Sequence, residues 1–289
     1  MDKIIKEKIA SLLANDEDIL SVEQLGGMTN QNYLVKTSAN QYIVKFFGKG
    51  TDKLINRQNE KFNLELLKDL KLDVENYLFD IEAGIKVNRY IENAETLDSA
   101  TIKTKFEKIA PILQTIHASG KELKGEFAPF EEIKKYESLI QGEIYYPNYE
   151  AVRKSVFCLK DQLEEIGIDK KSCHIDLVPE HFIEGPDGHL YLIDWEYSSM
   201  NDPMWDLAAL FLESEFTSAE EEEFLSLYES DKTPVSREKI RIYKILQDII
   251  WSLWTIYKEE NGADFGDYGI SRYNRAMNEL NYKGGTYEN

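Results

Sequence analysis

The chain has 289 residues, and its 34 Lys and Arg against 53 Asp and Glu give a formal net charge of −19. This acid surplus argues against nucleic acid and anionic membrane surfaces as partners, because both are bound through clusters of basic side chains. A hydrophobic fraction of 42% with 30% charged residues is a globular composition, and the length suits two lobes or domains.

The start of the chain, residues 1–10, mixes charged and apolar residues at helical spacing, which predicts a helix rather than a signal peptide. The sequence holds no run of the roughly 18 apolar residues that a membrane span needs, so we expect no membrane insertion. Its two cysteines, Cys158 and Cys173, are too few for a disulfide framework. These features predict a cytoplasmic protein and leave its oligomeric state open.

Short apolar runs in the N-terminal part predict strands at residues 19–25, 31–37 and 42–47. Residues 52–70 carry apolar side chains at helical spacing, and strand character returns at 77–81 and 84–91. The glycines and small polar residues between the first strands are typical of hairpins. We expect a small antiparallel sheet with one helix across it.

Helical spacing dominates from about residue 101 onward. The predicted helices cover residues 102–117, 130–141, 149–166, 205–216, 219–228 and 238–260. One hairpin interrupts them, because the apolar runs 182–183 and 190–193 flank a turn that contains Gly185 and Gly188. His117 ends an apolar helical pattern and is predicted to be a packed, hydrogen-bonded histidine. The whole pattern predicts an α+β fold class, with a boundary between two lobes within residues 91–100.

The densest group of polar residues lies on either side of the predicted hairpin. His174 and Asp176 precede it, and Asp194 follows it. Because a hairpin brings its ends together, Asp176 and Asp194 can share one cleft, where one carboxylate accepts a proton and the other holds a hard cation. Kinase active sites use two aspartates in this way. An isolated His-x-Asp segment is more often a polar loop with a capping Asp, but the second Asp after the hairpin favours the kinase interpretation.

One position departs from the kinase pattern. Kinases place an Asn metal ligand five residues after the catalytic Asp, and this chain has His181 there. Magnesium prefers oxygen ligands, so an imidazole nitrogen should weaken one metal contact or leave it to water or to Asp194. We expect activity to survive, reduced or with a changed metal preference.

A nucleotide site needs a glycine-bearing turn and a strand lysine upstream, and the chain has both. The turn Gly26-Gly27-Met28-Thr29-Asn30 offers backbone amides and the Thr29 hydroxyl to phosphate oxygens. Lys45 lies in a predicted strand, and Glu60 on the following helix can pair with it. Each feature alone has a plainer explanation, since Gly-Gly turns are common in hairpins and strand lysines usually face solvent. Together they predict an ATP site that includes Gly27, Thr29, Asn30, Lys45 and Glu60.

Three segments, residues 25–33, 174–181 and 193–203, resemble the choline kinase family, and the likeness covers nearly the whole chain. The chain looks closest to the bacterial choline kinases that serve phosphocholine decoration of surface polymers, within the aminoglycoside-phosphotransferase-like kinase fold. The resemblance implies a two-lobed, protein-kinase-like fold, with a nucleotide-binding lobe at residues 1–90 and a catalytic, choline-binding lobe at 91–289. It also implies that the protein uses ATP and Mg²⁺ to phosphorylate choline.

The resemblance also assigns roles to single residues. On the family pattern, Asp176 is the catalytic base with His174 beside it, and the metal is held by Asp194 and His181. The pair that orients the phosphates is Lys45 and Glu60. The hinge that receives adenine through backbone groups falls at Asn88, Tyr90 and Ile91.

A quaternary ammonium cannot donate hydrogen bonds, so its site must offer aromatic faces and negative charge. Trp251 and Trp254 share one face of a predicted helix at i,i+3 spacing, although such a pair more often serves core packing. The family pattern favours a choline cage that comprises Asp176, Tyr197, Glu213, Trp251, Trp254 and Tyr268.

Two other functions stay open. The first is a kinase for ethanolamine, an aminoglycoside or another small amino alcohol. A primary ammonium would need carboxylate or carbonyl acceptors, where this chain offers aromatic faces. The second is a pseudokinase that binds nucleotide or choline as a sensor, because His181 stands where an Asn is expected.

Overall fold

The computed structural model describes residues 18–27 and 30–284, with side chains described as far as residue 280. The helix predicted for residues 1–10 lies outside these ranges. The chain divides into two compact units. The first extends to Leu97 and includes Glu180–Glu196, and the second holds Asp98–Pro179 and the chain from Tyr197 onward. The predicted lobes, 1–90 and 91–289, assign residues 180–196 differently, and the role of each lobe stays a prediction.

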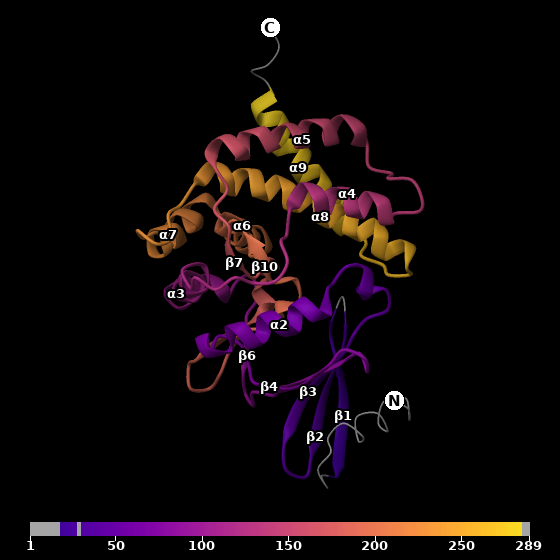
Figure 1. Cartoon of the computed structure of the whole chain (residues 1–289), viewed down its shortest axis with the longest axis vertical. Coiled ribbons are helices and arrows are strands. Elements are labelled where there is room, and N and C mark those ends of the chain that lie inside the picture. The colour runs from indigo at the N-terminus through magenta and orange to yellow at the C-terminus, as the bar shows by residue number, and fades with distance from the viewer. Residues whose placement is uncertain (1–17, 28–29, 285–289) are drawn as a thin grey trace. The chain divides into compact units, whose positions relative to one another are not determined.

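The first unit is built on a five-stranded antiparallel sheet in the order β1-β2-β3-β5-β4 (Figure 1). The strands are β1 (Ile19–Leu25), β2 (Gln31–Thr37), β3 (Gln41–Phe46), β4 (Asn76–Asp80) and β5 (Ile85–Arg89). Alternate side chains of β2, β3 and β5 form a core of Tyr33, Val35, Tyr42, Val44, Ile85 and Val87. The predicted antiparallel sheet is confirmed. Its register sets Lys45 directly opposite Lys86, on the face away from this core.

Helix α2 (Arg57–Leu67) begins at Asn56, whose side chain accepts hydrogen bonds from the backbone N–H groups of Gln58 and Asn59. This cap makes the helix shorter than the predicted range of 52–70, and the flanking segments form short 3₁₀ turns. Arg57 and Glu60 lie one turn apart on α2, and both are buried.

The predicted hairpin is formed by β8 (Phe182–Glu184) and β9 (Leu190–Leu192), which pair antiparallel. Strand β6 (Glu95–Thr96) adds to it and makes a three-stranded sheet in the order β6-β8-β9. The backbone N–H of Leu192 also donates to the carbonyl of Leu72, at 2.8 Å. These contacts tie the hairpin, and Asp194 after it, to the first unit.

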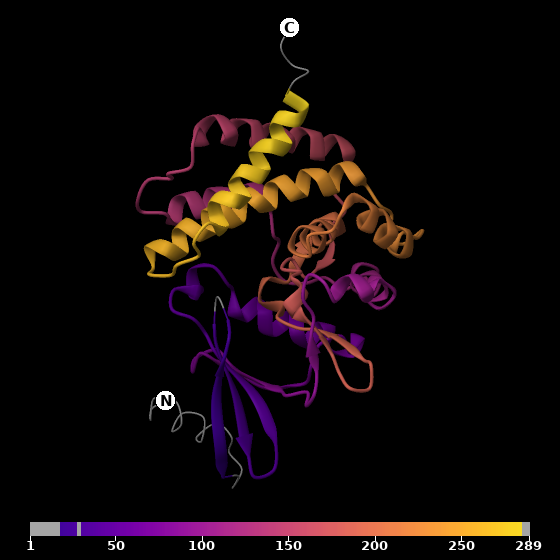
Figure 2. The same ribbon diagram turned by 180° about the vertical axis from the view of Figure 1, so that it is seen from behind.

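The second unit is mainly helical (Figures 1 and 2). Its helices are α3 (Phe106–His117), α4 (Pro129–Leu139), α5 (Tyr149–Ile166), α6 (Pro203–Glu213), α7 (Ser218–Tyr228), α8 (Arg237–Glu260) and α9 (Tyr268–Gly284). Helix α8 is 24 residues long and almost wholly buried from Ile240 to Tyr257, because it packs against α4, α5, α6 and α9. A two-stranded sheet of β7 (Lys171–Cys173) and β10 (Ser199–Asn201) lies among the helices.

The α+β fold class is confirmed, and the predicted helices are present with ends shifted by a few residues. Helix α9 and the strands β7 and β10 were not predicted. In the part of the chain that the structure describes, no helix combines the length and the apolar character that crossing a bilayer requires.

Candidate active site

Asp194 follows β9 in the first unit and forms an ion pair with Lys45 of β3, with 2.6 Å between Nζ and Oδ1. Its φ of 67° is in the left-handed region, which is uncommon for a residue other than glycine and is often found at functional sites. Burial alone would raise the pKa of Asp194, but attraction to Lys45, His181 and Lys86 outweighs it and holds the pKa well below the usual range. Asp194 is therefore ionised at neutral pH.

Glu60 lies near Lys45 but contacts other residues. Its carboxylate accepts hydrogen bonds from Lys86, at 3.1 Å, and from Arg57, at 2.7 Å. These contacts replace the direct Lys45–Glu60 pair that the sequence predicts. Lys86 lies opposite Lys45 in the sheet and pairs with Glu60, and Lys45 forms its ion pair with Asp194 instead. Burial opposes the charge of Lys45, but Asp194, Glu196 and, more weakly, Glu60 raise its pKa above its ordinary value.

A second carboxylate of the same motif, Glu196, joins this network. Its Oε2 accepts hydrogen bonds from Asn30, at 2.8 Å, and from Arg57, at 2.9 Å. The Asn30 side chain also accepts from the backbone N–H of Gly48, so its amide connects three segments of the first unit. Sequence analysis missed Arg57 and Glu196. The only signals were the position of Glu196 two residues after Asp194 and the spacing of Arg57 from Glu60.

The predicted phosphate turn is described in part, because Thr29 lies outside the described residues. Gly27 must be a glycine: a Cβ there would stand 2.7 Å from the carbonyl oxygen of Asn30 and 2.7 Å from the Asn32 side chain. The Asn32 amide donates to the carbonyl of Gly26, at 2.9 Å. The turn is thus held tightly where it is described.

The predicted adenine hinge lies at the end of β5. The Asn88 side chain accepts a hydrogen bond from Asn76 of the neighbouring strand, at 2.7 Å. The backbone N–H of Tyr90 donates to the carbonyl of Gln41, at 3.4 Å, and the carbonyl of Ile91 accepts from the N–H of Ala94. The assignment of adenine to these residues stays a prediction.

His181 lies beside Asp194, with 3.7 Å between Nε2 and Oδ2. The backbone N–H of Ile193 donates to the carbonyl of His181, at 2.9 Å, so the hairpin itself holds the two residues together. The ionised carboxylate of Asp194 suits a Mg²⁺ ion, whereas His181 supplies only nitrogen. The residues present fit magnesium through Asp194, with the remaining ligand positions left to phosphate oxygens and water.

Asp176 lies in the second unit, after a backbone conformation that is unfavourable for its neighbour. Ile175 has a φ of 78°, which costs a β-branched residue energy. Two backbone N–H groups, of His174 and Ile175, donate to the Asp206 carboxylate, both at 2.8 Å, and the Trp205 indole donates to the carbonyl of Ile175. These hydrogen bonds hold the loop that presents Asp176.

The His174 side chain is fully buried, which favours a role in holding this loop over contact with a substrate. Asp176 itself is partly exposed. Because Asp176 and Asp194 belong to different units, their meeting in one cleft stays a prediction.

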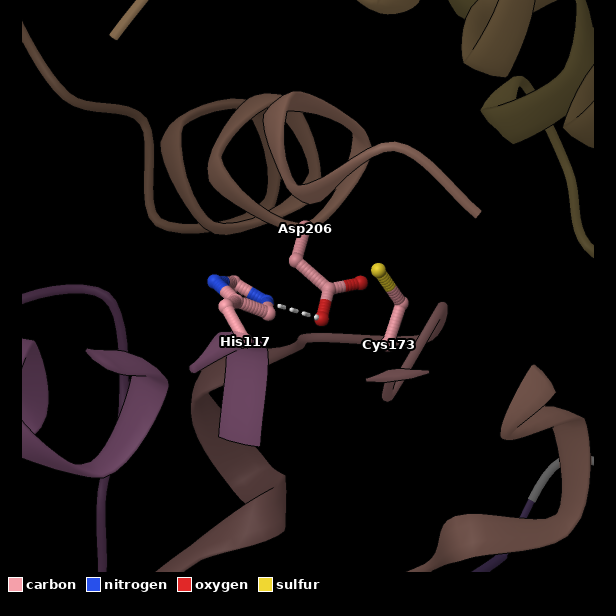
Figure 3. Close-up of side chains that lie close together, drawn as sticks. All are labelled: His117, Cys173 and Asp206. Carbon is pink, nitrogen blue, oxygen red and sulfur yellow. Dashed lines mark hydrogen bonds and ion pairs between the residues drawn. The ribbon is translucent and has the colours of Figure 1, made fainter. Parts of the chain in front are cut away.

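Three buried side chains, of His117, Cys173 and Asp206, lie close together in the second unit (Figure 3). Asp206 accepts from the His117 ring, at 3.0 Å, and the other ring nitrogen of His117 contacts the Tyr228 hydroxyl, at 2.7 Å. The Cys173 thiol donates to a backbone carbonyl, and burial, with the charge of Asp206, raises its pKa well above the usual range. Because His117 and Asp206 are hydrogen-bonded to each other and the Cys173 thiol stays protonated on the Asn201 carbonyl, the cluster is a packing network rather than a metal site. The predicted packed, hydrogen-bonded His117 is confirmed.

The aromatic residues predicted for choline form a continuous series of ring contacts in the second unit. Tyr197 meets Trp251 edge to face at a centroid distance of 5.8 Å, and Trp251 meets Trp254 at 6.4 Å. Phe265 extends the series, at 4.9 Å from Trp254 and 6.4 Å from Tyr268. We call these five residues the aromatic series. Sequence analysis missed Phe265, although it lies three residues before Tyr268.

The negative charge of Asp176 acts on two tyrosines of the second unit, Tyr136 and Tyr268. Burial raises the pKa of Tyr136 on α4, the negative charges of Glu132 and Asp176 raise it further, and a hydrogen bond with Tyr197 opposes the shift. Asp176 also acts on Tyr268, whose pKa is raised above its ordinary value mainly by burial. The Asp176 carboxylate and these aromatic faces, which suit a cation, therefore belong to the same unit, and the charge of Asp176 acts on Tyr268 at one end of the series.

Glu213, predicted to add negative charge to the choline cage, forms an ion pair with Arg272 of α9. Its charge is therefore compensated inside the protein.

A lysine and aspartate pair on a small sheet, with a strained, Asp-bearing loop in a helical unit, places the chain in the class of protein-kinase-like phosphotransferases. The family model described as choline/ethanolamine kinase matches residues 22–239. The chain belongs to the choline/ethanolamine kinase family.

Known relatives agree with this assignment. The structure of choline kinase LicA from Streptococcus pneumoniae is 77% identical, with a TM-score of 0.93 over 97% of this chain and 98% of that one. A second structure, of LicA in complex with AMP, is 77% identical with a TM-score of 0.92 and covers 98% of each chain. Protein LicA of Haemophilus influenzae is 32% identical over 268 residues, 89% of this chain and 78% of that protein. Ethanolamine kinase 2 of Rattus norvegicus is 24% identical over 86% of this chain and 73% of its own length.

Proposed function

We propose that this protein is a choline kinase, which transfers the γ-phosphoryl group of ATP to choline and forms phosphocholine and ADP. The observation that carries the proposal is the aromatic series, which lies in the same unit as Asp176. Aromatic faces attract a cation that has no N–H group, which is the property that separates choline from primary amines. The high identity to choline kinase LicA supports the same substrate.

In this proposal the first unit binds the nucleotide. Lys45, fixed by Asp194, neutralises phosphate charge, and the tight turn at Gly27 brings backbone close to the phosphates. Asp194 would hold Mg²⁺, which would supply positive charge against the negative charge that develops on the phosphates. The AMP complex of LicA supports a nucleotide as co-substrate.

The second unit binds the acceptor. Asp176 accepts the proton of the choline hydroxyl while the hydroxyl oxygen attacks the γ-phosphorus in line. The bond between the γ-phosphorus and the β,γ-bridging oxygen breaks, and ADP leaves with its electrons. The aromatic series of Tyr197, Trp251, Trp254, Phe265 and Tyr268 holds the trimethylammonium group. We further propose that the reaction takes place in the cytoplasm and that its product serves phosphocholine decoration of surface polymers.

Ethanolamine kinase is the second candidate, because ethanolamine kinases are relatives of this chain. An acceptor comparison separates the two. Coupled ADP assays with the purified full chain give kcat/KM for choline, ethanolamine and 3,3-dimethylbutan-1-ol, the neutral isostere of choline. We expect choline to exceed both others by tenfold or more, about 1.4 kcal/mol. A higher kcat/KM for ethanolamine would contradict the proposal.

A further inference from the structure

Arg272 of α9 contacts two carboxylates in the second unit. It forms an ion pair with Glu213 at the end of α6, and its Nη1 lies 3.1 Å from Oδ1 of Asp248 on α8. Its side chain is only 5% exposed, so it is held away from water. Arg275, one turn further along α9, also pairs with Asp248, at 2.6 Å. Two arginines therefore balance two carboxylates, and the network has no net charge.

The same guanidinium covers part of the aromatic series. The Arg272 Cζ lies 4.6 Å from the ring centroid of Tyr268, within the range of a cation–π contact. Burial raises the pKa of Tyr268, Glu213 and Asp176 raise it further, and Arg272 opposes the shift. Glu213, Arg272 and Asp176 therefore all act on the ring at the end of the aromatic series.

This arrangement bears on the choice between two acceptors. A primary ammonium brings three N–H donors that each need an acceptor when they leave water, and a carboxylate is the strongest one. A trimethylammonium group has no donors and gains from aromatic faces alone. Arg272 contacts one oxygen of the Glu213 carboxylate, Oε1, and neutralises its charge, so Glu213 attracts a primary ammonium less than an unpaired carboxylate would.

We propose that Arg272 is a specificity-determining residue, which neutralises Glu213 and covers one face of Tyr268 so that the aromatic series accepts a quaternary ammonium in preference to a primary one. The inference rests on the proposed function. It assigns the selection against primary amines to a positioning residue that touches neither ATP nor choline.

Arg272→Gln tests it directly. The variant frees Glu213, so kcat/KM for ethanolamine should rise, and the choline-to-ethanolamine ratio of kcat/KM should fall by about tenfold or more. We expect the change mainly in KM, because Asp176 and its loop are untouched. If kcat/KM for both acceptors falls in proportion, Arg272 serves packing and the inference is wrong.

Two further variants separate the effect of the freed Glu213 carboxylate from a general effect of losing an arginine. Arg272→Gln combined with Glu213→Gln removes the freed carboxylate and should return the ratio toward the wild-type value; a ratio that stays low contradicts the inference. Arg237→Gln is a matched control, because Arg237 forms an exposed pair with Glu222, with 57% and 55% of the side chains accessible. It should leave the ratio unchanged.

Folding is monitored by thermal unfolding of each variant. If Arg272→Gln does not fold, Glu213→Gln alone still tests the inference, because it leaves Arg272 and Arg275 with Asp248 alone and so adds one uncompensated positive charge to the network beside Tyr268. It should lower kcat/KM for choline more than for neutral 3,3-dimethylbutan-1-ol, and an equal effect on both would overturn the inference. A wild-type protein that makes no phosphocholine would instead refute the proposed function.

Discussion

Asp194 and Asp73 lie in the first unit within the influence of the same two lysines, yet their pKa values shift in opposite directions. Burial raises the pKa of Asp73 to about 6, and attraction to Lys86 only partly offsets it. Asp194 contacts Lys45 directly, and this attraction outweighs the effect of burial. Direct contact with a cation therefore decides the direction in which the pKa of each buried carboxyl shifts.

The raised pKa of Asp73 predicts a pH-dependent stability. A carboxyl whose pKa is higher in the folded state stabilises the fold fully below its unfolded pKa of 3.8, and this contribution is lost as the pH rises through about 6. Asn cannot ionise, so Asp73→Asn avoids this loss of stability at high pH. We expect the substitution to raise the free energy of unfolding by about 1–3 kcal/mol at about pH 7 and to change it little at about pH 4.

Urea unfolding at several pH values, without nucleotide or metal, measures this difference. Asp18→Asn, at an exposed position of the same unit, is the control and should show no pH-dependent gain. A gain for Asp73→Asn of the same size at both pH values would contradict the prediction.

Asp176→Asn tests the proposed base. The amide cannot accept the hydroxyl proton, so kcat should fall by about 10²–10⁴-fold, while nucleotide binding stays unchanged because Asp176 belongs to the other unit. Steady-state kinetics and calorimetric titration with ADP measure the two effects. Exposed Asp231→Asn is the matched control. A kcat within about threefold of wild type would exclude Asp176 as the base.

The sequence allowed the prediction of residues whose chemistry follows from spacing along the chain, such as Asp176 and Asp194 around the hairpin. It did not predict the partner of Glu60, because that depends on which residue of β5 lies opposite Lys45. Arg272 was missed for a similar reason. A helical arginine is ordinarily exposed, and only the packing of α9 on α8 brings it to Glu213.

At the scale of elements, helix α8 both builds the core of the second unit and supplies two rings of the aromatic series. Trp251 and Trp254 are 8% and 5% exposed, so core packing and ligand binding are both open to them. Their contacts with Tyr197 and Phe265, which are only partly buried, favour binding as well as packing.

Trp254→Ala and Trp254→Leu separate the two roles. Loss of the aromatic face should raise KM for choline about tenfold in both variants, while KM for ATP stays nearly constant. Leu retains most of the apolar packing, so a packing role predicts that Leu restores the choline KM. Equal changes in KM for choline and ATP would also point to packing. Initial-rate kinetics with each substrate varied in turn measure these constants.

Sequence analysis predicted the helices that are several turns long and the strands in which apolar and polar residues alternate several times. Helix α8 and strands β2 and β3 have such patterns, and their predicted ends lie within one residue of the observed ones. Strands β7 and β10 have three residues each, which is too few to show an alternation of apolar and polar residues. Helix α9 was not predicted, because the charged Arg272 at one of its buried positions interrupts the apolar pattern by which a helix is identified.

At the scale of the whole molecule, the net charge of −19 has opposite effects on the two substrates. Its long-range field attracts choline, a small permanent cation, and opposes ATP. ATP binding must therefore depend on local groups such as Lys45, whose pKa is raised so that it stays charged.

This field predicts a salt effect that depends on the charge of the acceptor. Raising KCl from about 20 to about 300 mM should lower kcat/KM for choline by about two- to tenfold, because screening shortens the reach of the field. The value for 3,3-dimethylbutan-1-ol, measured at saturating ATP in the same series, should change little. A parallel decrease for both acceptors would contradict electrostatic attraction of choline.

The central claim is that this chain phosphorylates choline although His181 stands beside Asp194, the proposed metal ligand. Phosphorus NMR of the purified protein with ATP, Mg²⁺ and choline tests it most directly, with the His181→Asn variant and exposed His189→Asn as its control. We expect wild type to form phosphocholine in equal amount to ADP, and His181→Asn to reach half-maximal activity at a lower Mg²⁺ concentration. If wild type forms no phosphocholine while His181→Asn does, the protein is a sensor rather than a kinase.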